Sequence, residues 1–171
     1  MLISQNISTE RWVSYIDSLK QANKLIVRDK SSRRPNWTDI SNKISCYFLD
    51  NSLVLIETNS VSLLDTTYRR YYIKQHSNDL IKVIETHEKY KDTYDKEDYC
   101  QTHKDKFGNC DFSLLKIYSE TTLIKFGKTS AFELKRDGNV ILLSRKLRKE
   151  KIQVFKDDYN ELQGLIIDRI D

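Results

Sequence analysis

The sequence NSLVLIETNSVSLLDTTYRRYY, from Asn51 to Tyr72, gives the clearest indication of how this chain folds. It contains two apolar runs that are rich in β-branched and aromatic residues, as is typical of strands. One carboxylate, Glu57, lies inside the first run, and the cluster Tyr68-Arg69-Arg70 lies inside the second. The stretch predicts two neighbouring strands. It also marks their charged side chains as candidate functional groups, because charge is costly to bury.

Runs of the same kind recur on both sides of this stretch. They alternate apolar and polar residues, which predicts strands at 25–28, 44–49, 53–58, 67–75, 80–87, 111–118, 121–126, 130–135, 140–147 and 152–155. Short polar joins make consecutive strands antiparallel neighbours; these joins are Asp50-Asn51, Ser77-Asn78, Ser119-Glu120 and Asp137-Gly138. No helix-length segment lies between strands, so a parallel α/β sheet is not expected.

The expected fold class is mainly β. About eight to ten strands in sequence order fit an antiparallel meander. Closing it into a calyx-like, lipocalin-like β-barrel would remove both sheet edges. Helical spacing predicts an N-terminal helix at about 8–23, in front of a barrel at about 25–156. The polar segment 90–106 is interpreted as one long loop at the barrel mouth, and 157–171 as a C-terminal segment with a short helix.

The overall composition is that of one globular domain, residues 1–171. The chain is 39% hydrophobic and 32% charged, and no run approaches the roughly 20 apolar residues that span a bilayer. The N-terminus has no basic start followed by an apolar core, so we expect a cytoplasmic protein without a secretion signal. The net charge of +4 is milder than that of a dedicated nucleic-acid binder, although basic residues cluster at 28–34, 68–74 and 145–151.

Three cysteines, Cys46, Cys100 and Cys110, give no sign of a disulfide framework or a metal site. Their number is odd, and a reducing compartment disfavours disulfides. The spacing of Cys100, His103 and Cys110 matches no standard zinc pattern, so neither a metal nor a tightly bound cofactor is expected. Cys110 is interpreted as a small buried residue, which is the usual role of a free cysteine.

Strand parity predicts that two charges lie on faces that otherwise carry apolar side chains. Glu57 would share a face with Leu53 and Leu55, and Arg145 would share one with Leu143. Two explanations stay open: a salt bridge that satisfies both partners, or a ligand that carries charge of its own. Arginine at a barrel mouth suits carboxylates or phosphates because its guanidinium can bind them with two hydrogen bonds.

The strand Tyr68 to Lys74 leaves a second class of function open. It interleaves aromatic and basic residues, as platforms for single-stranded nucleic acid do. The alternative is therefore a non-enzymatic nucleic-acid-binding or protein-binding β module that uses this strand and 145–151. A barrel interior filled by side chains would favour this module, and a pocket lined by Glu57 and arginines would favour a ligand-binding barrel.

Five motifs follow one another between about residues 30 and 156. They are P-N-W at Pro35, S-L-V-L-I-E-T at Ser52, T-Y-R-R at Thr67, F-G-N-C-D at Phe107, and D-G, S-R and Q-V-F from Asp137. Their order and approximate spacing resemble those of the T-type phycobiliprotein lyases (CpcT/CpeT family). The positions that match the family's motifs are Glu57, Tyr68, Arg69, Cys110, Asp111 and Arg145, whereas Tyr71 stands where the family has its second arginine.

The resemblance implies a chromophore lyase or bilin chaperone. Such a protein binds an open-chain tetrapyrrole of the phycoerythrobilin type and delivers it to a cysteine of an apo-phycobiliprotein β subunit. The resemblance implies that Glu57 and Asp111 are the catalytic groups at the pyrrole nitrogens. The groups expected to bind the bilin are Tyr68, Arg69, Arg70 and Arg145.

The bilin would be a substrate rather than a resident cofactor. The expected partners are the bilin and the apo-phycobiliprotein, and nucleic acid is not expected. The usage of Lys, Asn and Ile is typical of an AT-rich genome such as that of a cyanophage, which favours a divergent and shortened member of the family. It would act in the cytoplasm of a cyanobacterium or of an infected host, as a monomer or a homodimer.

Overall fold

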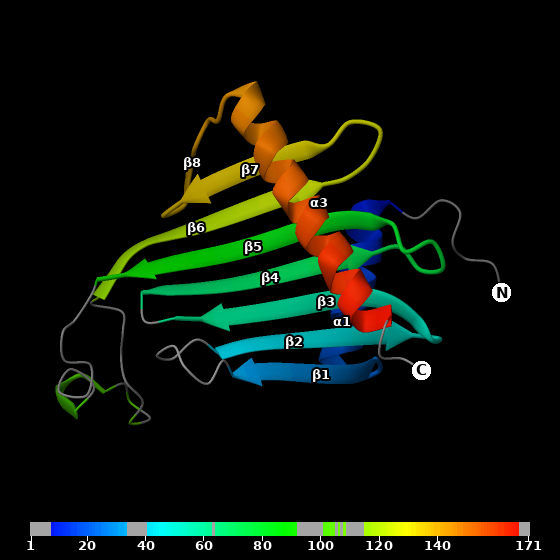
Figure 1. The fold of residues 1–171 in the computed structure, drawn as a ribbon, viewed down its shortest axis with the longest axis horizontal. Helices are drawn as coiled ribbons and strands as arrows, with labels where there is room; N and C mark the ends of the chain where they lie inside the picture. Colours follow the sequence, from blue (N-terminus) through cyan, green and yellow to red (C-terminus); the bar gives the residue numbers. More distant parts are fainter. Residues whose placement is uncertain are drawn as a thin grey trace.

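The structure is a computed structural model that describes residues 8–33, 41–62, 64–91, 101–104, 106, 108 and 115–167. Within these residues, eight strands form one sheet in sequence order, each antiparallel to the next (Figure 1). The strands are β1 (Ile26–Arg33), β2 (Ser41–Leu49), β3 (Ser52–Val61), β4 (Asp65–Ile73), β5 (Leu80–Tyr90), β6 (Lys116–Lys125), β7 (Ala131–Arg136) and β8 (Asn139–Val140). The predicted antiparallel meander is therefore confirmed.

A helix covers each face of this sheet. Helix α1 (Thr9–Gln21) begins after Ser8, whose hydroxyl accepts a hydrogen bond from the backbone N–H of Arg11. It lies behind the sheet in Figure 1, whereas α3 (Arg145–Ile167) crosses the front. Alternate side chains of each strand therefore face different helices, and the structure has three layers with two hydrophobic cores.

The core under α1 and the core under α3 share the strands but not the side chains. Val13 and Ile16 of α1 pack against a set from β2 to β4, namely Tyr47, Val54, Leu55 and Tyr72. Phe155 and Tyr159 of α3 pack against the other set, namely Cys46, Phe48, Ile56, Tyr71, Ile73, Val83 and Ile124. Burial of Cys46 raises the pKa of its thiol to about 11, so this cysteine is a core residue rather than a nucleophile.

A β-bulge changes the face assignment at the start of β3. Tyr47 pairs with Leu55, but Phe48 pairs with Leu53, so Val54 is the extra residue. Val54 and Leu55 both face α1, whereas Leu53 packs with the core under α3. The prediction that Glu57 shares a face with Leu55 is confirmed, and the prediction that it shares one with Leu53 is wrong because the bulge resets the parity.

The sheet is open. Strands β1 and β8 are its two edges, and they do not pair with each other in the described part of the chain. Closure into a barrel would bury apolar side chains on one inner face, but here α1 and α3 already bury those of both faces. The edge strand β8 is only two residues long, which limits the unpaired backbone at that edge.

Three of the four predicted turns are confirmed and one is wrong. Ser77-Asn78 lies in the segment that joins the antiparallel strands β4 and β5. Asp50-Asn51 and Asp137-Gly138 have positive φ angles and join antiparallel strands, as hairpin turns of their kind require. Ser119-Glu120 instead lies inside β6, so the predicted strands 111–118 and 121–126 overlap one continuous strand. Polar residues do not interrupt β6 there because neither helix packs on that part of the sheet.

The predicted strands 140–147 and 152–155 are wrong, because β8 ends at Val140 and α3 begins at Arg145. Ser144 caps the helix: its hydroxyl accepts from the backbone N–H of Leu147, and its carbonyl accepts from that of Arg148. The buried stripe of the helix has spacings of three and four and consists of Ile152, Phe155, Tyr159, Leu162 and Ile166. None of the helices in the described part of the chain combines the length and apolar character needed to cross a membrane.

The adjacent tyrosines Tyr71 and Tyr72 lie in different cores and allow the contribution of a buried hydroxyl to stability to be compared between them. Both are fully buried, but Tyr72 donates a 2.9 Å hydrogen bond to Asp17 Oδ1, whereas the hydroxyl of Tyr71 has no hydrogen-bond partner among the described residues. We expect Tyr72→Phe to lower the free energy of unfolding by about 1–2 kcal/mol. Tyr71→Phe should change it by less than about 0.5 kcal/mol or raise it, because it removes an unsatisfied polar group. Urea unfolding of both variants measures this, and equal losses would contradict the assignment.

Candidate ligand-binding site

Strand β4 separates the side chains of the Tyr68-Arg69-Arg70 cluster. Tyr68 donates a hydrogen bond to Glu57 on the α1 face, and Arg70 has the same strand parity as Tyr68. Arg69 points to the opposite face, where it contacts Asp158 of α3. The predicted cluster is therefore two sites that the sheet keeps apart.

Glu57 is the centre of the site on the α1 face. Its Oε1 accepts from Lys20 Nζ of α1 at 2.5 Å and from the hydroxyl of Tyr68. Its Oε2 accepts from the hydroxyl of Tyr47 at 2.7 Å. Burial alone would raise the pKa of Glu57, but the hydrogen bonds from Lys20, Tyr68 and Tyr47 outweigh it and lower the pKa. The carboxylate stays charged and joins the end of α1 to the sheet.

Arg69 has the corresponding position on the α3 face. Its Nε lies 2.5 Å from Glu85 Oε2, and its Nη1 lies 2.9 Å from Asp158 Oδ2. The guanidinium carbon also lies 5.5 Å from the centroid of the Phe155 ring. Burial would lower the pKa of Arg69, but the charges of Glu85 and Asp158 raise it overall. Arg69 is therefore an ion-pair partner of α3 and is already satisfied.

Arg70, in contrast to Arg69, forms no ion pair among the described residues. Its guanidinium lies 6.0 Å from the Tyr68 ring centroid and 5.9 Å from that of Tyr72. Its buried Nε has no hydrogen-bond partner among the described residues. The side chain of Lys82, on the same face, is also buried, and desolvation lowers its pKa. The α1 face therefore holds two cations that form no ion pair within the described structure.

Arg145 does not join these residues. It is the first residue of α3, and it is exposed. The prediction that it shares a strand face with Leu143 is wrong, because no strand exists at this position. Asp111 lies outside the described residues, as do Cys100, Cys110 and the motif residue Pro35.

Two of the three tyrosines of strand β4 cannot act as a platform for nucleic-acid bases. Tyr71 and Tyr72 are both 0% exposed, so neither ring can stack on a base. Burial also raises the pKa of Tyr71 to about 12, which keeps its hydroxyl protonated. The aromatic residues Tyr71 and Tyr72 fill the two opposite cores. The basic residues Arg69 and Arg70 precede them in the strand, nearer its polar end.

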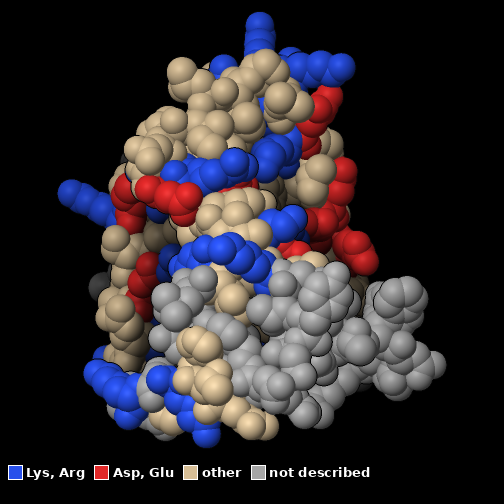
Figure 2. Space-filling model, turned by 90° about the vertical axis from the view of Figure 1, so that its left-hand side faces the viewer, with Lys and Arg blue, Asp and Glu red and all other residues tan. Residues whose placement is uncertain are grey.

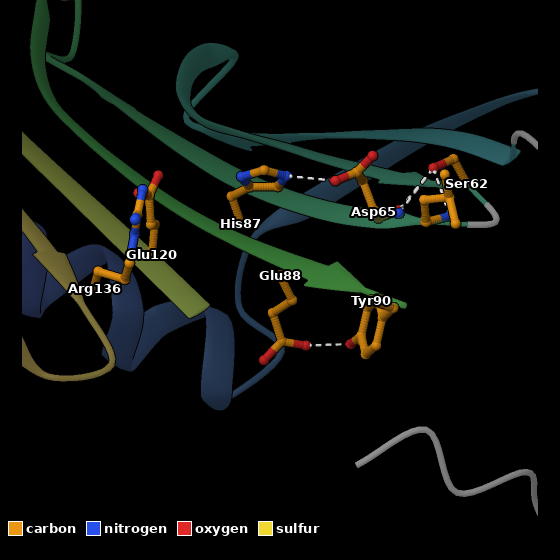
Figure 3. A network of polar contacts seen from close by, with 8 residues as sticks. Ser62, Asp65, His87, Glu88, Tyr90, Glu120 and Arg136 are labelled. Carbon is orange, nitrogen blue, oxygen red and sulfur yellow. Dashed lines mark hydrogen bonds and ion pairs between the residues drawn. The ribbon is translucent and has the colours of Figure 1, made fainter. Parts of the chain in front are cut away.

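The uncovered end of the sheet, where β4 and β6 start and β5 and β7 end, carries balanced charges (Figure 3). His87 Nε2 lies 3.0 Å from Asp65 Oδ1, and Arg136 Nη2 lies 2.5 Å from Glu120 Oε1. Figure 2 shows basic and acidic side chains interspersed on this end of the molecule, without a broad area of one sign. The described residues of this surface therefore form no extended basic patch of the kind that a polyanion would need.

An open cleft of about 620 Å³ lies on the α3 side of the sheet. Its walls are α3, the turn between β4 and β5, and the turn between β6 and β7. It is lined by Lys74, Asn78, Asp79, Leu80, Ile81, Phe126, Gly127, Ser130, Lys156, Tyr159, Asn160 and Gln163. The volume is within the range of small-molecule sites, which are roughly 300–1,000 Å³.

The hydroxyl of Tyr159 connects two walls of the cleft. This hydroxyl donates to the carbonyl of Asn78 at 2.7 Å and accepts from Gln163 Nε2 at 2.6 Å, so α3 is fixed to the turn between β4 and β5. Lys156 Nζ lies 5.8 Å from the centroid of the Phe126 ring. Neither Lys156 nor Lys74 forms an ion pair in the part of the chain that the structure describes. The lining therefore combines three apolar side chains, Leu80, Ile81 and Phe126, with two cations that form no ion pair among the described residues.

The sequence interpretation missed this cleft because it assigned 152–155 to a strand. The signal was present as a polar stripe at helical spacing, Lys156, Asn160 and Gln163, beside the buried stripe that includes Phe155 and Tyr159. The sequence carries no comparable signal that the two turns would line the cleft. Their approach to α3 depends on how the strands twist under the helix.

The fold and the cleft define a small β domain. It has an open antiparallel sheet, a helix on each face, and a ligand-sized cleft beside α3. Comparison with protein-family models, with curated proteins and with solved structures finds nothing that matches this chain. Its function therefore has to be inferred from the chemistry of these residues.

The role of Glu57 can be tested by its pH dependence. Because the pKa of Glu57 is lowered below its ordinary value of 4.5, its contribution to stability is present above that pH and is lost as pH falls through the lowered value. We expect Glu57→Gln to lower the free energy of unfolding by about 2 kcal/mol at neutral pH, because it removes the charge of a partly buried ion pair with Lys20. The difference from the wild type should shrink in acid.

The matched control is Glu133→Gln, which removes a carboxylate from an exposed ion pair with Lys135. Its effect should be below about 1 kcal/mol. Urea unfolding at neutral and acid pH measures both variants. A Glu57→Gln variant as stable as Glu133→Gln at neutral pH would show that Glu57 does not join α1 to the sheet.

Proposed function

We propose that this protein is a carrier for a small organic anion, which binds in the cleft between α3 and the sheet. The observation that carries the proposal is the presence in one cleft of apolar side chains, among them Phe126, and of Lys74 and Lys156, two lysines without an ion-pair partner in the described structure. The ligand's flat apolar part would lie against Phe126 and Leu80. Its anionic groups would accept charge-assisted hydrogen bonds from the lysines.

The ligand class that fits this chemistry and the sequence resemblance is an open-chain tetrapyrrole. A bilin has a flat conjugated body, two propionates and pyrrole N–H groups. The cleft offers two cations for the propionates and one carboxylate, Asp79, for the N–H groups. Asn160 and Gln163 supply further hydrogen-bonding groups at the rim.

The geometry supports a binding role more than a catalytic one. A general acid needs a proton near neutral pH, but the pKa of Glu57 is lowered and both of its oxygens are occupied. In a lyase reaction the acceptor cysteine would add across the ethylidene double bond of the bilin, and the product would keep both the sulfur and the proton of the thiol. The carrier's contribution would be to hold and orient the bilin.

Pigment binding tests this proposal directly. Phycoerythrobilin is titrated into the protein, and its absorbance is followed. A red-shifted, sharpened band should saturate at equimolar pigment, and Lys74→Glu and Lys156→Glu should each weaken binding by about tenfold or more, since each removes a charge-assisted bond. Lys146→Glu is the control, because Lys146 is an 86% exposed lysine on the same helix outside the cleft.

The location of the ligand is tested by a further pair of variants. Arg145→Ala and Arg70→Ala should leave the titration unchanged, because neither residue lines the cleft. If Arg70→Ala removes the response and both lysine variants keep it, the ligand is on the α1 face. An absence of any spectral change with wild-type protein would contradict bilin binding altogether.

Transfer of the pigment is a separate expectation. The loaded protein is incubated with an apo-phycoerythrin β subunit, and the denatured mixture is separated on a gel and stained with zinc. We expect pigment fluorescence on the β subunit to appear faster with the protein than with free bilin, because orientation favours one addition product. Equal rates would restrict the function to carrying the pigment.

A further inference from the structure

Residues 140–151, here called the basic tip, combine high exposure with an unusual density of positive charge. Five of the residues from 145 to 151 are basic, namely Arg145, Lys146, Arg148, Lys149 and Lys151, and Glu150 is the only acid among them. Residues 145–150 are all exposed. This short segment therefore carries as much net positive charge as the whole chain, whose net charge is +4.

The basic tip extends beyond the sheet. Figure 1 shows the start of α3 reaching past β7 and β8, away from the remaining strands. Arg148 lies four residues before Ile152 and seven before Phe155, so it belongs to the stripe of α3 that faces the sheet. It is nevertheless exposed, because no strand lies beneath this part of the helix.

The stability of α3 does not explain this charge. Its first turn contains no acidic residue, although acids at that position interact favourably with the helix dipole and bases do not. Among the described residues of α3, one intrahelical ion pair offsets the repulsion, between Lys146 and Glu150 at 4.0 Å. This arrangement of positive charges destabilises the helix. It therefore indicates a partner that supplies the opposite charge.

Exposed aliphatic side chains lie among these cations. Leu142 is 92% exposed, Val140 is 58% exposed, and Leu147 is 49% exposed. The basic tip contains no aromatic residue that could stack on a base. Aliphatic side chains between cations match the interface of an anionic bilayer, where phosphates meet acyl chains.

We propose that the basic tip docks the protein on an anionic lipid surface. Lys146, Arg148 and Lys149 would bind lipid phosphates and carboxylates, while Leu142 would enter the boundary between headgroups and acyl chains. The contact is peripheral and reversible, because it relies on a few charges and one or two aliphatic side chains. It leaves the cleft at the other half of α3 open to its ligand.

The test uses flotation of the 171-residue chain with vesicles. We expect binding to vesicles of phosphatidylcholine mixed with phosphatidylserine, and at least about tenfold weaker binding to phosphatidylcholine alone, because the cations dominate the attraction. High salt should release the protein. Lys146→Glu combined with Lys149→Glu should reduce binding by about tenfold or more.

Two further variants distinguish the partner. Lys24→Glu combined with Lys91→Glu makes the same change in net charge at exposed positions outside the basic tip, and it should bind nearly as the wild type does. Leu142→Ser should weaken vesicle binding several-fold without affecting folding, since Leu142 makes almost no contact with the domain. Its binding to a double-stranded oligonucleotide should equal that of the wild type.

Three outcomes would overturn the proposal. Equal binding to neutral and anionic vesicles would show that charge does not drive the contact. Equal losses in the two double-lysine variants would show that only net charge matters. Binding to the oligonucleotide without binding to anionic vesicles would assign the basic tip to nucleic acid. None of these measurements requires the ligand of the cleft, so their failure would leave that proposal unaffected.

Discussion

Burial of both faces of one sheet is the constraint on which this structure depends. A sheet with one apolar face needs only one covering layer, but strands β2 to β4 carry buried side chains on both faces. Each helix must therefore be held at a defined position on its own face. Two ion pairs help to hold the helices in position. Glu57 binds Lys20 of α1, and Arg69 binds Asp158 of α3.

These two contacts explain why charges occur inside apolar strands. Glu57 and Thr58 pair with Arg70 and Arg69, so the two anchoring charges lie on successive rungs of the ladder between β3 and β4 and point to opposite faces. A buried charge is tolerated when its partners are fixed, as they are for Glu57 with three donors. The arrangement also leaves Arg70 as the charge near this ladder that has no ion-pair partner in the described structure.

The sequence predicted the elements that depend on local information and missed those that depend on packing. Alternation in Ser52 to Ile73 and the turn Asp137-Gly138 were enough to predict an antiparallel meander. The bulge at Val54 and the contact of Arg69 with α3 could not be predicted, because both require the position of distant residues. The first half of α3 was missed because its aliphatic residues fit a strand over short windows, although the spacing from Ile152 to Ile166 is helical. The short helix predicted within 157–171 is confirmed as the second half of α3, up to Ile167.

The walls of the cleft have a consequence for how this domain can change. Two of them are hairpin tips, the turns at 74–79 and 126–130, and the third is the exposed flank of α3. Hairpin tips accept insertions and deletions more readily than strands do, because their backbone is solvated and carries few core contacts. The size and chemistry of the bound molecule can therefore diverge between descendants of this chain while both hydrophobic cores, and the ion pairs that hold them, remain the same.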